Sequence, residues 1–246
     1  MADYDYKAGK KRIETILDNE LEVFEANKLP SDDKFTFDNG YYSWVTGLFI
    51  DIRKSSILFA DEDKEKVSKI IRCFTSEIIE ILRNDDRLRE IGIRGDCVYA
   101  VYTTPLISDE VEISDKAICV NTYMKMLNKL LENKKYPTID IGIGVATSQE
   151  LVVKAGRKDV GINNKVWIGA AVTKASNLSS LGNKDGLSPI VFSSLSYLCI
   201  IDDLIEKNVE AKSWFSEYYH ISYGTYYVAN LIKTEFDAWI DGGMKE

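Results

Sequence analysis

The order of hydrophobic periods between residues 44 and 147 constrains the fold of this chain more than any other feature. Short continuous apolar runs predict buried strands, and apolar residues spaced three and four apart predict amphipathic helices. In chain order the segments are a strand over 44–52, a helix over 67–81, a strand pair over 88–104, a helix over 117–131 and a strand over 138–148. This βαββαβ order predicts an α+β fold, the ferredoxin-like split βαβ unit, with an antiparallel sheet and its helices on one face.

Both ends of the chain add to this unit. An apolar stripe at Ile13, Leu17, Leu21 and Phe24 predicts a helix over 7–28, which we expect to pair between two subunits. Turn residues then predict a connection, so we divide the chain into residues 1–40, helix and connection, and a main domain over 41–246. After the last strand, "ELVVKAG" and "NKVWIG" predict short extended pieces, and "AAVTKASNLSSLG" predicts a helix. The tail predicts a β extension, a hairpin about Gly224, and a short terminal helix in "KTEFDAWI".

Composition narrows the possible partners. The net charge of -8 gives no broad positive field, so we expect no nucleic-acid partner. No apolar run approaches the roughly 18 residues that a membrane helix needs, and the N-terminus lacks the apolar segment of a signal peptide. We therefore expect no membrane contact and a cytoplasmic location. The four cysteines form no metal-binding or redox motif and are expected to be reduced core thiols, while the single histidine, His220, is expected to be packed and non-catalytic.

Two carboxylates point to a metal site. Asp51 ends the first strand, and Asp96 lies in the tight turn of the strand pair, "IRGDCVYAVY". These strands are neighbours in a split βαβ sheet, so the two carboxylates meet at one end of it. Carboxylates brought together repel unless a cation lies between them, and Mg²⁺ or Mn²⁺ prefers such oxygen ligands. The backbone carbonyl of Ile52 is a further candidate ligand.

A candidate phosphate site follows at once. In "FIDIRKSS" the chain turns from Asp51 toward a helix, with Ser55 and Ser56 in its first turn, where free N–H groups bind anions. Arg53 and Lys54 add positive charge at the same place. A metal site beside a phosphate site is what a nucleoside triphosphate requires.

Four stretches together carry a family resemblance: "FIDIRKSS", "IRGDCVYAVY", "IDIGIGVATSQELVVKAGRK" and "VWIGAAVTKASNL". In this order and spacing the chain resembles the class III nucleotidyl cyclases. The resemblance implies that two Mg²⁺ or Mn²⁺ ions are held by Asp51 and Asp96, and that the ribose 3'-oxygen attacks the α-phosphorus with loss of pyrophosphate. It also implies a homodimer, in which the helix carrying Thr173 and Asn177 completes the partner's site.

The base-reading positions of the purine cyclases differ here. Gly92 stands where adenylyl cyclases have lysine and guanylyl cyclases glutamate, and Lys165 falls near the second base-reading position. Arg94, two residues before Asp96, points to the same side as Gly92 by strand alternation and suits the carbonyl oxygens of a pyrimidine. In these respects the chain resembles the Pycsar pyrimidine cyclases of bacterial anti-phage defence, which make cyclic CMP or cyclic UMP for a separate effector protein. We expect UTP as substrate, with CTP the alternative.

The dimer helix also departs from the family pattern. Thr173 and Asn177 stand where asparagine and arginine are usual, and an uncharged Asn177 lowers transition-state stabilisation by about 2–4 kcal/mol by oxyanion-type precedents. Lys154, Arg157 and Lys158 are candidates for the missing positive charge. Two alternatives stay open: an adenylate or guanylate cyclase with an atypical base pocket, and a degenerate cyclase-homology module that binds nucleotide without turnover.

Overall fold

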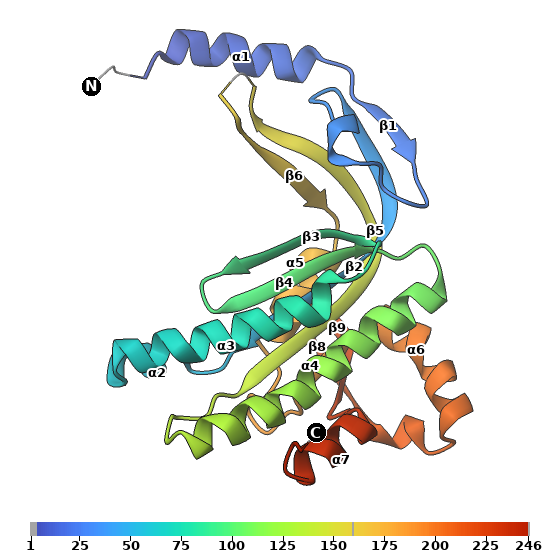
Figure 1. Ribbon diagram of the computed structural model, residues 1–246. Coiled ribbons are helices and arrows are strands. Elements are labelled where there is room, and N and C mark those ends of the chain that lie inside the picture. The colour runs from blue at the N-terminus through green and yellow to red at the C-terminus, as the bar shows by residue number, and fades with distance from the viewer. Residues whose placement is uncertain (1–3, 159, 246) are drawn as a thin grey trace.

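The computed structural model describes residues 4–158 and 160–245, and its centre is one nine-stranded sheet (Figure 1). Its strands are β1 (Glu22–Glu25), β2 (Asn39–Ile52), β3 (Leu88–Arg94), β4 (Cys97–Thr103), β5 (Ile141–Arg157), β6 (Ile162–Ile168), β7 (Ile190–Ser193), β8 (Phe215–His220) and β9 (Gly224–Ala229). The path β3-β4-β2-β5 is antiparallel throughout. This is the strand order of the ferredoxin-like unit, so the predicted α+β fold is confirmed.

Helices cover both faces of the sheet. They are α1 (Tyr6–Asp18), α2 (Ser55–Asp61), α3 (Lys64–Arg83), α4 (Ile107–Asn133), α5 (Ala171–Ser179), α6 (Ser194–Lys207) and α7 (Thr234–Asp241). Side chains alternate along β2, so Leu48 and Ile50 pack in the large core beneath α3, α4 and α6. Phe49 points the other way, into a smaller cluster with Ala175 and Leu178 of α5. The predicted pair of helices on one face is α3 and α4, and α5 lies on the opposite face.

Glycines in β5 let α5 lie directly on the strand backbone. A Cβ placed on Gly144 would overlap the Ala175 carbonyl oxygen and the Ser179 nitrogen of α5, and one on Gly142 would overlap the Ser179 carbonyl oxygen. The glycines of "TIDIGIGVATS" thus allow the close backbone approach that a side chain would prevent. Both the depth and the direction of α5 on the sheet depend on this close approach.

The N-terminal helix is shorter than predicted. It ends at Asp18, and the predicted span to residue 28 is wrong because residues 22–25 are extended and pair in parallel with residues 39–42 of β2. Leu21 and Phe24 therefore lie outside the helix. Ile13 and Leu17 do lie on it, and their side chains are 56% and 77% exposed, so the apolar stripe of α1 is left largely uncovered by the described residues.

Strands β2 and β5 are longer than predicted. β2 begins at Asn39, and β5 runs without a break to Arg157, so that "ELVVKAG" is the outer half of β5 and not a separate piece. The extensions form because each outer half gains a second neighbour, β1 for β2 and β6 for β5. These four segments make an arm that projects beyond α2–α7 in Figure 1, with α1 at its far end, and the arm has a small core at Leu29, Phe35 and Val152.

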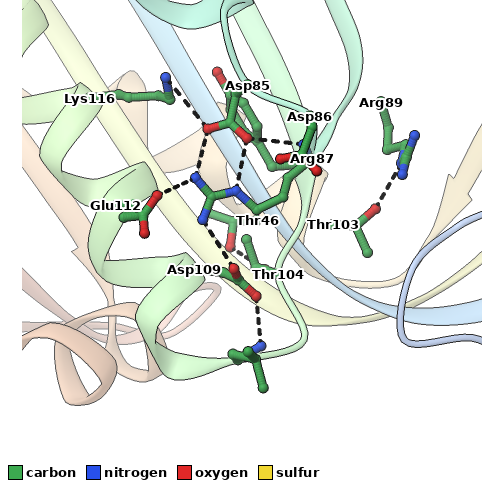
Figure 2. Close-up of polar contacts among 12 residues, drawn as sticks. Thr46, Asp85, Asp86, Arg87, Arg89, Thr103, Thr104, Asp109, Glu112 and Lys116 are labelled. Carbon is green, nitrogen blue, oxygen red and sulfur yellow. Dashed lines mark hydrogen bonds and ion pairs between the residues drawn. The ribbon is translucent and has the colours of Figure 1, made fainter.

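A charge network fastens the start of β3 to α4 (Figure 2). The Arg87 guanidinium donates to Asp85 at 2.8 Å, to Asp109 at 3.0 Å and to Glu112 at 2.6 Å. The Asp85 side chain is only 4% exposed, and Lys116 lies 3.5 Å from it. Because these charges are desolvated and mutually paired, the network holds the edge of the sheet against the N-terminal half of α4.

The tail agrees with its prediction. β8 and β9 form the hairpin about Gly224, and α7 is the terminal helix. The expected packed position of His220 is wrong, because its side chain is exposed at the end of β8, with the ring stacked on Tyr223 at a centroid distance of 4.4 Å. The cysteines are free as expected. The expected core position is wrong for Cys73, which is exposed, whereas the other three are partly buried and Cys97 packs against the smaller cluster beneath α5. No helix in the described part of the chain is long and apolar enough to cross a membrane.

Candidate active site

The two predicted metal aspartates share one end of the sheet. Asp51 lies directly opposite Cys97 in the β2–β4 pairing, and Asp96 is the residue before Cys97. Burial raises the pKa of Asp51, the Arg53 guanidinium opposes that rise, and the negative charge of Asp96 adds to it. The mutual repulsion of two carboxylates is the electrostatic signature of a place that favours a cation.

The donor set fits Mg²⁺ or Mn²⁺. Within residues 4–158 and 160–245 no three His, Cys, Asp or Glu side chains are grouped as a metal centre. Mg²⁺ commonly takes only one or two carboxylates and completes its shell with phosphate oxygens and water. The neighbouring Cys97 does not suit such an ion, because Mg²⁺ and Mn²⁺ prefer oxygen ligands to sulfur. A pair of aspartates therefore suits an ion that is shared with a phosphate substrate.

Arg53 is engaged within the protein. Its guanidinium donates to the Asp51 carboxylate and, at 2.8 Å, to the carbonyl oxygen of Ser180, just past the end of α5. Only 13% of its side chain is exposed. In this conformation Arg53 neutralises Asp51 and links β2 to α5, so it must turn away from Asp51 before it can contact a substrate phosphate.

The predicted phosphate turn adjoins Asp51. Lys54 has a left-handed backbone, with φ of 54°, and precedes the first turn of α2, which contains Ser55 and Ser56. The side chains of Lys54 and Ser56 are exposed. The left-handed residue turns the chain sharply away from β2, and this brings the backbone of Ser55 and Ser56 next to the aspartate end of the sheet.

Tyr99 fills the space above Gly92, the predicted base-reading position. The two residues are cross-strand partners, and a Cβ on Gly92 would lie 2.7 Å from the Tyr99 hydroxyl oxygen. The Tyr99 ring stacks on Phe49 at 5.1 Å, and its hydroxyl donates to Glu90 Oε1 at 2.7 Å. The absent side chain at Gly92 thus leaves no enlarged pocket in this chain, because the neighbouring aromatic ring occupies the volume. Arg94 is exposed at the end of β3, toward the aspartates.

Sequence reasoning missed the part that Glu90, Tyr99 and Trp167 play here. Trp167 Nε1 donates to Glu90 Oε2 at 2.7 Å, so this carboxylate joins the arm to β3. The signal was present in the sequence, since a tight turn at Gly95-Asp96 pairs residue 94 with 97 and therefore Gly92 with Tyr99. Strand alternation also sets Glu90 on the same side as Gly92.

The predicted basic residues lie on the arm. Lys165 pairs with Asp32 at 2.6 Å and donates to the Arg89 carbonyl oxygen at 3.0 Å, and Lys154 lies over the Phe37 ring at 5.6 Å. Lys154 is twelve residues along β5 from Gly142, the partner of Asp51, which corresponds to about 40 Å of strand. Arg157 and Lys158 are farther still. The single chain does not bring these side chains to Asp51.

Thr173 and Asn177 lie on α5, away from the face that packs on the sheet. Ala171, Ala175 and Leu178 are buried against the strands, whereas Thr173 is exposed and Asn177 partly exposed. One turn separates Thr173 from Asn177, so both lie along one side of the helix. They are positioned to contact a molecule lying on α5 from outside the chain.

Comparison with known proteins gives one consistent result. The family "Adenylate and Guanylate cyclase catalytic domain" matches residues 38–214. The chain is 55% identical to a uridylate cyclase of Treponema porcinum over 241 residues, covering 98% of this chain and 82% of that protein. It is 28% identical to a uridylate cyclase of Gulbenkiania mobilis, covering 97% and 96%. Among solved structures, the adenylyl cyclase CyaB of P. aeruginosa shares the fold, with a TM-score of 0.62 at 19% identity over 77% of this chain and 95% of that one.

Proposed function

Since this chain belongs to the class III nucleotidyl cyclases, the family of adenylate and guanylate cyclase catalytic domains, we propose that it converts UTP into 3',5'-cyclic UMP and pyrophosphate. Cyclase activity follows from the family itself. The choice of UTP rests on the 55% identity to a uridylate cyclase and on the absence of the purine-reading side chains at Gly92 and Lys165. The observation that carries the chemistry is the juxtaposition of Asp51 and Asp96 at one end of the sheet.

Asp51 and Asp96, with the Ile52 carbonyl as a third oxygen, would hold the divalent ions. The ions supply positive charge that lowers the pKa of the ribose 3'-hydroxyl and neutralises the triphosphate. On our proposal Arg53 leaves Asp51 when the ions bind and turns toward the phosphates. Lys54 and the backbone of Ser55 and Ser56 then orient the β- and γ-phosphates.

We propose that the active enzyme is a homodimer with two composite sites. Thr173 and Asn177 face outward on α5 and are suited to a substrate held by the aspartates of a second copy. Thr173 would donate to the ribose and Asn177 to the α-phosphate oxygens. Lys154 and Arg157, on the arm and far along β5 from Asp51, would contribute charge only to the partner's site.

An aromatic ring, and not a base-reading side chain, fills the space beside Gly92. The Tyr99 ring, held by Glu90 and stacked on Phe49, occupies the volume where purine cyclases place their base-reading side chain. Arg94 is the nearest flexible donor for the O2 and O4 acceptors of uracil. A side chain at residue 92 would overlap the Tyr99 ring, so the purine-reading group of the family has no place here, which supports a pyrimidine.

The test is direct competition among the four nucleoside triphosphates. Purified protein with Mn²⁺ is given UTP, CTP, ATP and GTP together, and the products are identified by mass spectrometry. We expect cyclic UMP in excess over the others, and no product from D51A or D96A. A cyclic purine product would instead support the first alternative, an adenylate or guanylate cyclase with an atypical base pocket. Tight UTP binding by both wild type and variants without turnover would instead identify a nucleotide-binding module.

We further propose a role as a signal generator in anti-phage defence, acting in the cytoplasm. The support is the resemblance to pyrimidine cyclases that supply a separate effector protein. The measurement is the cyclic UMP content of cells that carry the gene, before and after phage infection, with D51A as the control. An unchanged content after infection would remove this role while leaving the enzymatic proposal intact.

A further inference from the structure

The first turn of α5 is capped from the sheet and not by its own sequence. Ala170, the residue before the helix, offers no side-chain acceptor. Instead, Glu150 of β5 accepts a hydrogen bond from the Ala171 backbone N–H at 2.5 Å. Ser148 Oγ accepts from the same N–H at 2.9 Å and donates to Glu150 Oε1 at 3.0 Å. Two side chains of one strand therefore share the Ala171 N–H, one of the donors that the helix leaves free.

This carboxyl group is deeply buried. Glu150 has no exposed surface, and its Oε2 atom has no hydrogen-bond partner among the described residues. Burial raises its pKa, while the hydrogen bonds from Ser148 and the start of α5 oppose that rise. A buried carboxyl is costly without compensation, and here the N–H groups and dipole of α5 compensate it. The position of α5 and that of Glu150 are thus tied together.

Gly169 shows how tightly the carboxyl fits. A Cβ on Gly169 would lie 2.6 Å from the carboxyl carbon of Glu150, although Gly169 is itself exposed. Its backbone φ is not in the left-handed region, so an alanine would be free of backbone strain. The glycine of "VWIGAAV" is therefore explained by the space that Glu150 needs.

We infer that Glu150 is a positioning residue for the reaction, which acts by fixing the depth and rotation of α5 and so the places of Thr173 and Asn177. The inference rests on the proposed composite site. Thr173 lies two residues after Ala171 in the same first turn, so a shift of that turn moves its hydroxyl directly. A misplacement of about 1 Å can cost on the order of 10²-fold in rate.

The first experiment compares E150Q with E150M. Glutamine keeps an acceptor oxygen for the Ala171 N–H, whereas methionine has similar length and no such acceptor. We expect E150Q to retain kcat within about threefold, and E150M to lose kcat by on the order of 10²-fold with KM for UTP little changed, since the aspartates and the phosphate turn are intact. Equal losses in the two variants would overturn the inference.

Mixed dimers then separate positioning from general damage. Differently tagged D51A and E150M chains are co-expressed, and the heterodimer is purified through both tags. One of its two sites combines an intact Asp51 with an intact α5, so we expect about half the wild-type activity. A heterodimer of N177A and E150M has a defective α5 in both sites and is expected to stay inactive.

A third heterodimer, D51A with N177A, distinguishes the two proposals. If it is inactive, the composite site itself is refuted. If it is active while D51A with E150M is not, the composite site stands and the inference about Glu150 falls.

G169A repeats the test without touching a buried residue. The added methyl group displaces the Glu150 carboxyl, so we expect the same loss of kcat as in E150M. We also expect the same recovery of activity in a heterodimer of G169A with D51A. E110Q is the matched control, because Glu110 is equally buried but lies on α4, across the sheet from α5. E110Q is expected to keep wild-type kcat, and a G169A protein with wild-type kcat would contradict the inference.

Discussion

Replacing Gly144 with alanine should lower both stability and activity, because β5 carries α5 at backbone contact distance. The added Cβ would overlap the Ala175 carbonyl oxygen and the Ser179 nitrogen, both of which are backbone atoms of the helix. A carbon and a carbonyl oxygen need about 3.3 Å, so α5 must move outward by on the order of 1 Å. A rotamer change cannot relieve this overlap.

Two effects of opposite sign set the change in unfolding free energy. Overpacking of a close contact costs about 1–3 kcal/mol. Alanine also stiffens the unfolded chain, which favours folding by about 0.4–1 kcal/mol. The strain is the larger effect, so we expect a net loss in urea denaturation. The displaced α5 moves Thr173 and Asn177, and cyclic UMP formation should fall by on the order of 10²-fold.

The matched control is G242A. A Cβ on Gly242, at the end of α7, meets its nearest neighbour at 3.4 Å, an ordinary contact distance. This variant should keep the urea midpoint and the activity of the wild type. If G144A equals G242A in both measurements, the argument that the β5 backbone sets the depth of α5 is refuted.

Three further changes test other parts of the molecule. Y99A empties the volume beside Gly92 and should raise the ratio of ATP to UTP turnover by on the order of tenfold; an unchanged ratio argues against Tyr99 as the limit of the pocket. R87A leaves the buried Asp85 with only Lys116 at 3.5 Å and the backbone N–H of residue 87 at 3.0 Å, and should cost about 3–5 kcal/mol in urea denaturation. A loss below about 1 kcal/mol would mean that the network behaves as a surface pair. Burial raises the pKa of Glu110 in the folded state above its value in the unfolded chain. The resulting stabilisation of the folded state is fully present below about pH 4.3, the ordinary glutamate pKa, and is lost as the pH rises through the folded-state pKa. Relative to E110Q, wild type should lose stability over that interval in urea titrations, and parallel pH curves would contradict the assignment.

The candidate site was partly accessible from sequence. Asp51 and Asp96 were expected at one end of the sheet because the strand order and a tight turn fix that geometry locally, and the register agrees. The ion pair between Arg53 and Asp51 could not be predicted from the sequence. The Arg53 guanidinium is held in place by the carbonyl oxygen of Ser180, 127 residues away along the chain. Glu150 was missed for the same reason: its partner is the first turn of a helix that follows a second hairpin strand. The assignment of the other site residues to metal, phosphate and base stays a prediction.

The sequence by itself determined the βαββαβ unit and the position of the β3–β4 turn. These features depend on periodicity and on residue types within a few positions of one another. Only the tertiary structure decided where α1 ends, how far β2 and β5 extend, and what fills the space above Gly92. In each case the outcome depends on which distant segment supplies a strand neighbour or a ring, and a contact between distant segments leaves no period in the chain.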